Sequence, residues 1–140
     1  MIVEPYRAEH LHALDLQEAQ AYIGPNLTVE HAKALESVHA ITATQDGRVL
    51  AVGGVIELWP GRAFIWSYLD RQAAKHMIAI HRVAQRMLAG YHGSRIEADV
   101  DLDFEPGHRW MKMLGFKLET ACMLKYRPDG GAMSKYVRIR

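Results

Sequence analysis

The sequence predicts a mixed α/β domain in which helices cross over between the strands of one central sheet. The apolar pattern switches between helical spacing and alternation in the order strand, two helices, three strands, long helix, acidic strand, short helix, two strands. At 140 residues, 49% of them apolar, the chain has the size of one compact domain, so we expect a single domain over residues 1–140. Ligands of such sheets lie where strand ends diverge.

The first part of the chain is expected to form one short strand followed by two helices. Ile2 and Val3 would form the strand, and a turn at Gly24-Pro25-Asn26 would end a first helix that begins near residue 8. The Thr28 hydroxyl can cap the second helix. The apolar stripes of the two helices are Leu11, Leu14, Leu16 and Ala19 in the first, and Ala32, Leu35 and Val38 in the second.

Three strands in series should follow as a meander. They cover residues 39–46, 49–58 and 63–69, and Asp46-Gly47 is a strong hairpin turn between the first two. The pair Gly53-Gly54 suggests a β-bulge in the second strand. The third strand carries Phe64, Trp66 and Tyr68 on one face, and both core packing and contact with a ligand are open for Trp66 and Tyr68.

A long helix and a strongly alternating strand come next. Residues 72–91 have helical apolar spacing, and Gly90 is placed to end this helix. Residues 96–104 alternate without exception, which predicts a strand with one apolar and one acidic face. The apolar face would hold Ile96, Ala98, Val100, Leu102 and Phe104, and the acidic face Glu97, Asp99, Asp101 and Asp103.

The C-terminal part predicts a short helix and two final strands. Pro106 suits the first helical turn, and Gly115 suits a left-handed C-cap against which Phe116 packs back. The two strands, residues 117–126 and 132–139, would flank a turn built on proline, aspartate and glycine.

Composition excludes several classes of partner. The formal net charge is +1, from 17 basic and 16 acidic residues, so we expect no nucleic-acid partner. The eight histidines lack ligand spacing and the single Cys122 cannot form an internal disulfide, so we expect no metal site and interpret Cys122 as a buried strand thiol. The first five residues are too short and polar for a signal peptide, and no apolar run approaches the about 20 residues of a membrane span.

Three motifs identify a family. The helix sequence 106–116, which ends in Leu-Gly-Phe, the strand 96–101 that leads into it, and the turn 126–131 before a closing Tyr136-Val137-Arg138 together resemble the GCN5-related N-acetyltransferase (GNAT, acyl-CoA N-acyltransferase) superfamily. Within it they are similar to the phage and prophage branch that includes the small internal virion protein of short-tailed coliphages.

This resemblance implies an acyl-CoA N-acyltransferase-like fold, with a mixed, mostly antiparallel sheet of about six to seven strands flanked by about four helices. It implies acetyl-CoA or another acyl-CoA as cofactor and an unidentified amine as acceptor. It also implies a location in the host cytoplasm or the virion interior, where other virion proteins would be partners, and it leaves a homo-oligomer open.

The resemblance also assigns cofactor-binding positions. The backbone of Ser67, Tyr68 and Leu69 would pair with pantetheine and polarise the thioester oxygen. The loop 71–76 would present amides to the pyrophosphate, since free N–H groups at a helix start bind anions. In that loop Arg71 fits the family pattern, Ala74 and His76 replace a glycine and a second small residue, and Lys75 and His76 add positive charge, as solvated side chains or as anion contacts.

Catalysis is the least decided part. Glu97 or Asp99 would accept the proton of the amine, and the alternative is that the acidic face is a solvent-facing surface. Many family members have a tyrosine acid where this chain has Met111, which has no proton to donate. Three functions therefore stay open: an N-acyltransferase, a non-catalytic virion protein that keeps the fold, and a CoA-binding module without turnover.

Overall fold

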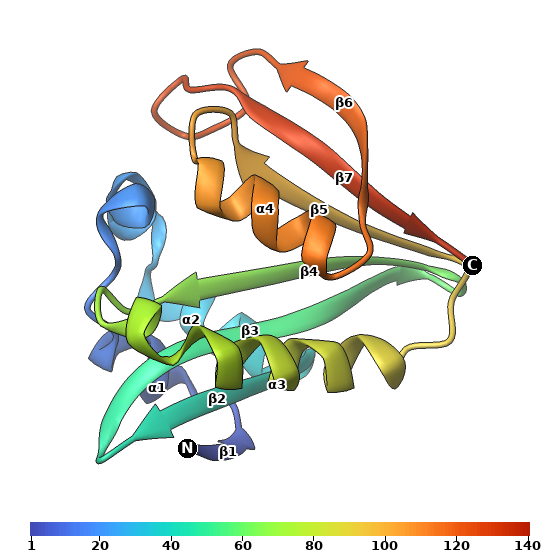
Figure 1. The fold of residues 1–140 in the computed structure, drawn as a ribbon. Helices are drawn as coiled ribbons and strands as arrows, with labels where there is room; N and C mark the ends of the chain where they lie inside the picture. The colour runs from blue at the N-terminus through green and yellow to red at the C-terminus, as the bar shows by residue number, and fades with distance from the viewer.

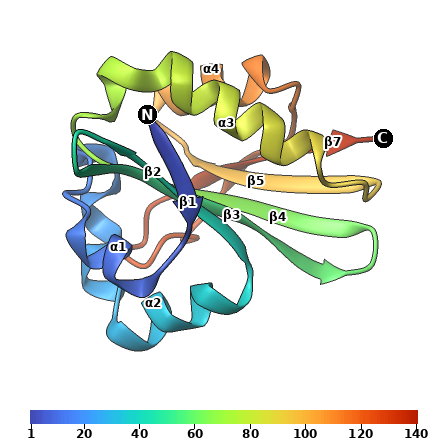
Figure 2. The same ribbon diagram turned by 90° about the horizontal axis from the view of Figure 1, so that it is seen from below.

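The computed structural model describes all 140 residues as a seven-stranded sheet between two layers of helices. The strand order is β1-β2-β3-β4-β5-β7-β6. Helices α3 and α4 cover one face, and α1 and α2 cover the other (Figures 1 and 2). The strands are β1 Ile2–Pro5, β2 His39–Gln45, β3 Arg48–Trp59, β4 Arg62–Leu69, β5 Arg95–Asp101, β6 Lys117–Met123 and β7 Met133–Ile139. The helices are α1 Ala8–Ala13, α2 Val29–Ala34, α3 Met77–Ala89 and α4 Glu105–Met113, with 3-10 segments η1 Glu18–Asn26, η2 Leu35–Ser37 and η3 Ala73–His76.

The sheet is mixed and mostly antiparallel, which confirms the predicted fold class. Its one parallel pair is β4 with β5, and that pairing covers only residues 62–64 against 95–97. Beyond Phe64 the two strands diverge, so the sheet opens into a V near its centre (Figure 1). The rest of β4 is left with an edge that β5 does not pair.

The pairing of β2 and β3 confirms the predicted hairpin turn and corrects the predicted β-bulge. Asp46 and Gly47 both have positive φ, 50° and 79°, as a two-residue hairpin turn requires. The predicted bulge at Gly53-Gly54 is wrong, because both residues pair in regular register and the shift lies between Ala43 and Thr44. A β-carbon on Gly54 would lie 2.4 Å from the His39 carbonyl oxygen, so the glycine is needed for close strand approach.

Several predicted elements are shorter than their apolar pattern suggested: α3 covers 77–89 rather than 72–91, and β6 ends at residue 123 rather than 126. The first helix ends at Ala13, and the apolar residues after it lie in a loop and in η1. The acidic strand ends at Asp101 rather than 104, because the Phe104 N–H bonds back to the Asp101 carbonyl in a turn and Phe104 takes the N-cap position of α4.

Cys122 is exposed, so its assignment as a buried thiol is wrong. It belongs to β6, whose residues are mostly exposed. The reason is topological, because β6 is the last strand of the sheet order and pairs only with β7.

Helix α4 ends in the predicted glycine cap. Gly115 has φ +86°, its N–H bonds to the Lys112 carbonyl, and Phe116 N–H bonds to the Met111 carbonyl at 2.9 Å. This pattern is a Schellman motif, which satisfies the last carbonyls of the helix. Phe116 is buried and packs in the cluster that joins α3, α4 and β5.

We expect Gly115→Ala to lower the free energy of unfolding by about 1 kcal/mol, because a β-carbon disfavours positive φ although it would meet no neighbour. Urea unfolding measures the change. Gly90→Ala is the matched control: Gly90 caps α3 at φ −78°, so the same substitution should be neutral or stabilising. Equal losses in both variants would contradict the role of positive φ.

Candidate functional site

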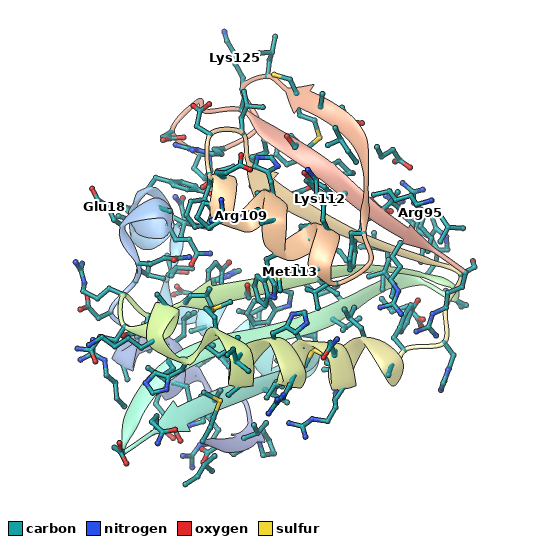
Figure 3. The ribbon with its side chains drawn as sticks, viewed as in Figure 1. Glu18, Arg95, Arg109, Lys112, Met113 and Lys125 are labelled. Atoms are coloured by element: carbon teal, nitrogen blue, oxygen red, sulfur yellow. The ribbon has the colours of Figure 1, made fainter.

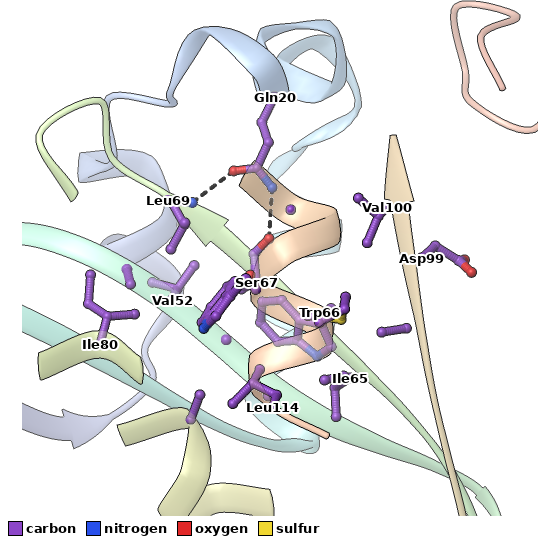
Figure 4. Close-up of a pocket in the computed structure, with 18 of the residues that line it drawn as sticks. Gln20, Val52, Ile65, Trp66, Ser67, Leu69, Ile80, Asp99, Val100 and Leu114 are labelled. Carbon is purple, nitrogen blue, oxygen red and sulfur yellow. Dashed lines mark hydrogen bonds between the residues drawn. The ribbon is translucent and has the colours of Figure 1, made fainter. Parts of the chain in front are cut away.

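A largely apolar cavity of about 190 Å³ lies where β4 and β5 diverge. It reaches under α3 and α4, so the wall is built from both helices as well as from the open sheet (Figure 4). Residues that carry its polar groups come from β4, from β5 and from residues 17–22. They include Gln17, Gln20, Tyr22, Ser67, Asp99 and Asp101.

The open edge of β4 is occupied by a side chain. Gln20 Nε2 donates to the Ser67 carbonyl at 2.8 Å, and its Oε1 accepts from Leu69 N–H at 2.9 Å (Figure 4). Gln17 adds to this pairing, because its own N–H bonds to the Leu69 carbonyl and its Nε2 donates to Gln20 Oε1 at 3.1 Å. The backbone groups expected to hold pantetheine are therefore exposed to the cavity but already paired.

Residues 17–26, called the strap below, cross from β4 to β5. At the far end Tyr22 donates its hydroxyl proton to Asp101 Oδ1 at 2.8 Å, and the Arg127 guanidinium lies 4.0 Å from the Tyr22 ring centre. Burial and the bond to Asp101 raise the pKa of Tyr22, and burial raises the pKa of Asp101. The phenol is therefore protonated at neutral pH and acts as a hydrogen-bond donor.

Asp70, which is 2% exposed, stabilises the loop after β4 through hydrogen bonds to its carboxylate. Its carboxylate accepts from Arg48 and from the N–H groups of Asp15 and Gln72. Burial raises the pKa of Asp70, but these donors outweigh it, and the net pKa lies below its ordinary value. The ionised carboxylate thus fixes the path of the chain from β4 into α3.

The predicted pyrophosphate loop forms the 3-10 segment η3 rather than the first turn of α3. Arg71 Nε bonds to Asp15 at 2.9 Å, and its N–H bonds to the Asp15 carbonyl. Ala74 and Lys75 are exposed, and His76 is half-buried. The loop thus brings a guanidinium, an ammonium and an imidazole to the start of α3, with a methyl group at Ala74 beside them.

Glu97 is buried, 2% exposed, in a cluster of three cations. Arg62, Arg95 and Lys135 all contact its carboxylate, and Arg62 above all lowers the pKa of Glu97 to about 2. The cluster sits where β4 and β5 still pair, and Arg95 lies across the molecule from Glu18 of the strap (Figure 3). Glu97 is absent from the cavity wall.

Asp99 belongs to the cavity wall, two residues further along β5. Its side chain is 9% exposed, and Oδ1 lies 3.1 Å from Lys135 Nζ without the alignment of a hydrogen bond. Met111 lines the same cavity from α4 and is 7% exposed. The structure therefore offers two carboxylates at this wall, of which Asp101 accepts the Tyr22 hydrogen bond, and no α4 hydroxyl.

Several solved acetyltransferases have the same arrangement of strands and helices. A protein assigned as a phosphinothricin N-acetyltransferase superposes with a TM-score of 0.77 at 14% identity, covering 99% of this chain and 97% of that one. A GNAT-family acetyltransferase from Bacillus anthracis gives a TM-score of 0.69 at 13% identity, covering 98% and 93%. The chain has the GNAT acetyltransferase fold.

One GNAT-fold neighbour was solved with coenzyme A. It is the ribosomal L7/L12 α-N-protein acetyltransferase RimL, with a TM-score of 0.61 at 18% identity, over 71% of this chain and 60% of RimL. Comparisons with protein-family models and with curated proteins give no match. No helix has the length and apolar character of a membrane span, and no three His, Cys, Asp or Glu side chains gather as a metal site.

The GNAT-fold geometry brings together only part of the predicted site. Ser67, Leu69 and Asp99 line one cavity, whereas Tyr68 is absent from its wall and packs in the core cluster beneath α1 and α2. The sequence analysis missed Gln20. No local pattern marks that residue, because its role depends on contacts across 47 and 49 residues of sequence.

Proposed function

We propose that this chain is an acyl-CoA-dependent N-acyltransferase of the GNAT superfamily. The observation that carries the proposal is the cavity between diverging β4 and β5, with Ser67 and Leu69 backbone groups on its wall. A strand edge that lacks a neighbour can pair with the amides of an extended ligand such as pantetheine. RimL, which shares the fold, holds coenzyme A, and this supports CoA as the donor carrier.

The reaction would be direct transfer of an acetyl or other short acyl group to an amine. The amine nitrogen attacks the thioester carbonyl, a C–N bond forms, and the C–S bond breaks with its electron pair moving to the CoA sulfur. N–H groups of β4 near Leu69 would stabilise the oxygen that becomes negative. Solvent protonates the thiolate, since Met111 offers no proton.

Asp99 is the better placed of the two predicted bases. It reaches the cavity, whereas Glu97 is held by three cations and has its pKa lowered to about 2. A carboxylate that is so strongly stabilised in its ionised form is a weak proton acceptor. We therefore assign proton acceptance to Asp99, and to Glu97 the role of holding β4, β5 and β7 together.

The pyrophosphate would meet Arg71, Lys75 and His76 at the start of α3. These side chains supply positive charge, and a helix start favours an anion. The Ala74 methyl group, exposed in the same turn, is the feature that departs from the family pattern. The fit of this loop to a pyrophosphate is therefore decided by how closely the backbone at Ala74 can be approached.

Calorimetric titration with acetyl-CoA tests the proposal. We expect the unaltered protein to bind with micromolar affinity, about −8 kcal/mol, and Ala74→Gly to bind several-fold tighter. Ala89→Gly, an exposed alanine at the other end of α3, is the control and should leave affinity unchanged. No binding by either the unaltered protein or Ala74→Gly at millimolar acetyl-CoA would refute the acyltransferase proposal.

A second candidate is a non-catalytic virion protein of the phage branch, acting in the host cytoplasm or virion interior. Ala74, His76 and Met111 support it, because each lies where a group used in the family's chemistry is expected. Binding that is absent in the unaltered protein and recovered in Ala74→Gly would favour this candidate, as would co-purification with assembled virions. A binding module without turnover would show the affinity and no acyl transfer.

A further inference from the structure

The open edge of β4 would be energetically costly if it were left bare. Beyond Phe64 no strand pairs with this edge, yet Ser67 is half-buried and Leu69 is buried. A buried backbone N–H or carbonyl without a partner is strongly disfavoured, so the chain must supply partners or a ligand must. In this structure the chain supplies them.

The partner has the chemistry of a backbone amide. The Gln20 side chain presents one carbonyl and one N–H, and they bind the Leu69 N–H and the Ser67 carbonyl just as a neighbouring strand would (Figure 4). Gln17 Nε2 also donates to Gln20 Oε1, which fixes the amide in this orientation. An extended ligand that pairs with β4 needs these same two groups.

The strap that carries Gln20 is anchored on the other side of the opening as well. Tyr22 bonds to Asp101 at the end of β5, and Arg127 from the β6–β7 turn stacks on its ring. Arg127 also forms an ion pair with Asp129. The strap therefore bridges the V, with one attachment on β4 and one on β5.

We propose that the Gln20 side chain competes with ligands for the open edge of β4, and that an amide-bearing ligand binds there only after Gln20 leaves. The two hydrogen bonds of Gln20 to Ser67 and Leu69 are called the seal below. This inference rests on the proposed function, because it takes CoA as the ligand. Binding would exchange the two Gln20 hydrogen bonds for two ligand hydrogen bonds, and the strap would swing about its Tyr22 anchor. The apparent affinity of the ligand is its intrinsic affinity multiplied by the fraction of molecules in which the edge is open.

Removing the competitor should raise affinity rather than lower it. In Gln20→Ala we expect CoA and pantetheine each to bind about 10-fold tighter, from the loss of two competing hydrogen bonds. Pantetheine carries the amides without the pyrophosphate, so it reports on the edge independently of the loop at Ala74. Glu18→Ala, an exposed strap residue, is the matched control and should bind like the unaltered protein.

Hydrogen exchange of the Leu69 amide, monitored by NMR, tests without any ligand whether Gln20 protects this N–H group. We expect exchange at least 10-fold faster in Gln20→Ala than in the unaltered protein or Glu18→Ala. Unchanged Leu69 exchange overturns the seal, and weaker CoA binding by Gln20→Ala overturns the competition by making Gln20 part of the ligand site. If no variant binds CoA or pantetheine, the proposed function fails, and Leu69 exchange still decides the seal.

Discussion

Replacing Glu97 with glutamine is expected to lower the free energy of unfolding by about 3 kcal/mol at pH 7. The carboxylate is buried and neutralises Arg62, Arg95 and Lys135, and removing one side of such a cluster leaves cations without compensation. The lowered pKa gives a similar figure, since a fall from 4.5 to about 2 corresponds to about 3 kcal/mol at 1.36 kcal/mol per unit.

The pH dependence of this loss has a definite sign. A depressed folded-state pKa stabilises the protein above the unfolded value of 4.5, and that stabilisation is lost as the pH falls toward about 2. Urea unfolding of the unaltered protein and Glu97→Gln should therefore differ less than half as much at pH 3 as at pH 7. Glu119→Gln removes an exposed partner of Arg95 and should cost far less. A pH-independent difference would contradict this account.

The fold could be predicted because its signals are local. Asp46-Gly47, Pro106 and Gly115 each mark a turn or a helix end by their own backbone preferences, and all three lie where expected. The failures concern partners distant in sequence. Gly54 permits close approach of β2 instead of forming a bulge, and Cys122 is exposed because β6 is the outermost strand.

The site was predictable to a smaller extent for the same physical reason. Alternation places Glu97 and Asp99 on the same face of β5, but it cannot show that β4 leaves β5 between them. That divergence leaves Glu97 buried among cations and places Asp99 on the cavity wall. The strap contact of Gln20 depends on tertiary structure alone, so no spacing rule could have identified it.

We expect Asp99→Asn to reduce kcat/KM for acetyl transfer by about 100-fold, while the affinity for CoA stays unchanged. Asparagine keeps the size of the side chain but cannot accept a proton, and general base catalysis is commonly worth at least this factor. The measurement is thiol release from acetyl-CoA with a panel of primary amines. Asp103→Asn, an exposed carboxylate beyond the end of β5, should retain full activity.

The pH profile separates a base from a merely structural carboxylate. An amine must lose a proton to attack, and without Asp99 it can do so only to water or hydroxide, which becomes favourable as the pH approaches the amine's own pKa near 10. The deficit of Asp99→Asn should therefore narrow steadily between pH 7 and pH 10. A deficit that stays constant over this range, or that comes with weakened CoA binding, would mean that Asp99 acts by holding Lys135 in place, since Oδ1 lies 3.1 Å from its Nζ.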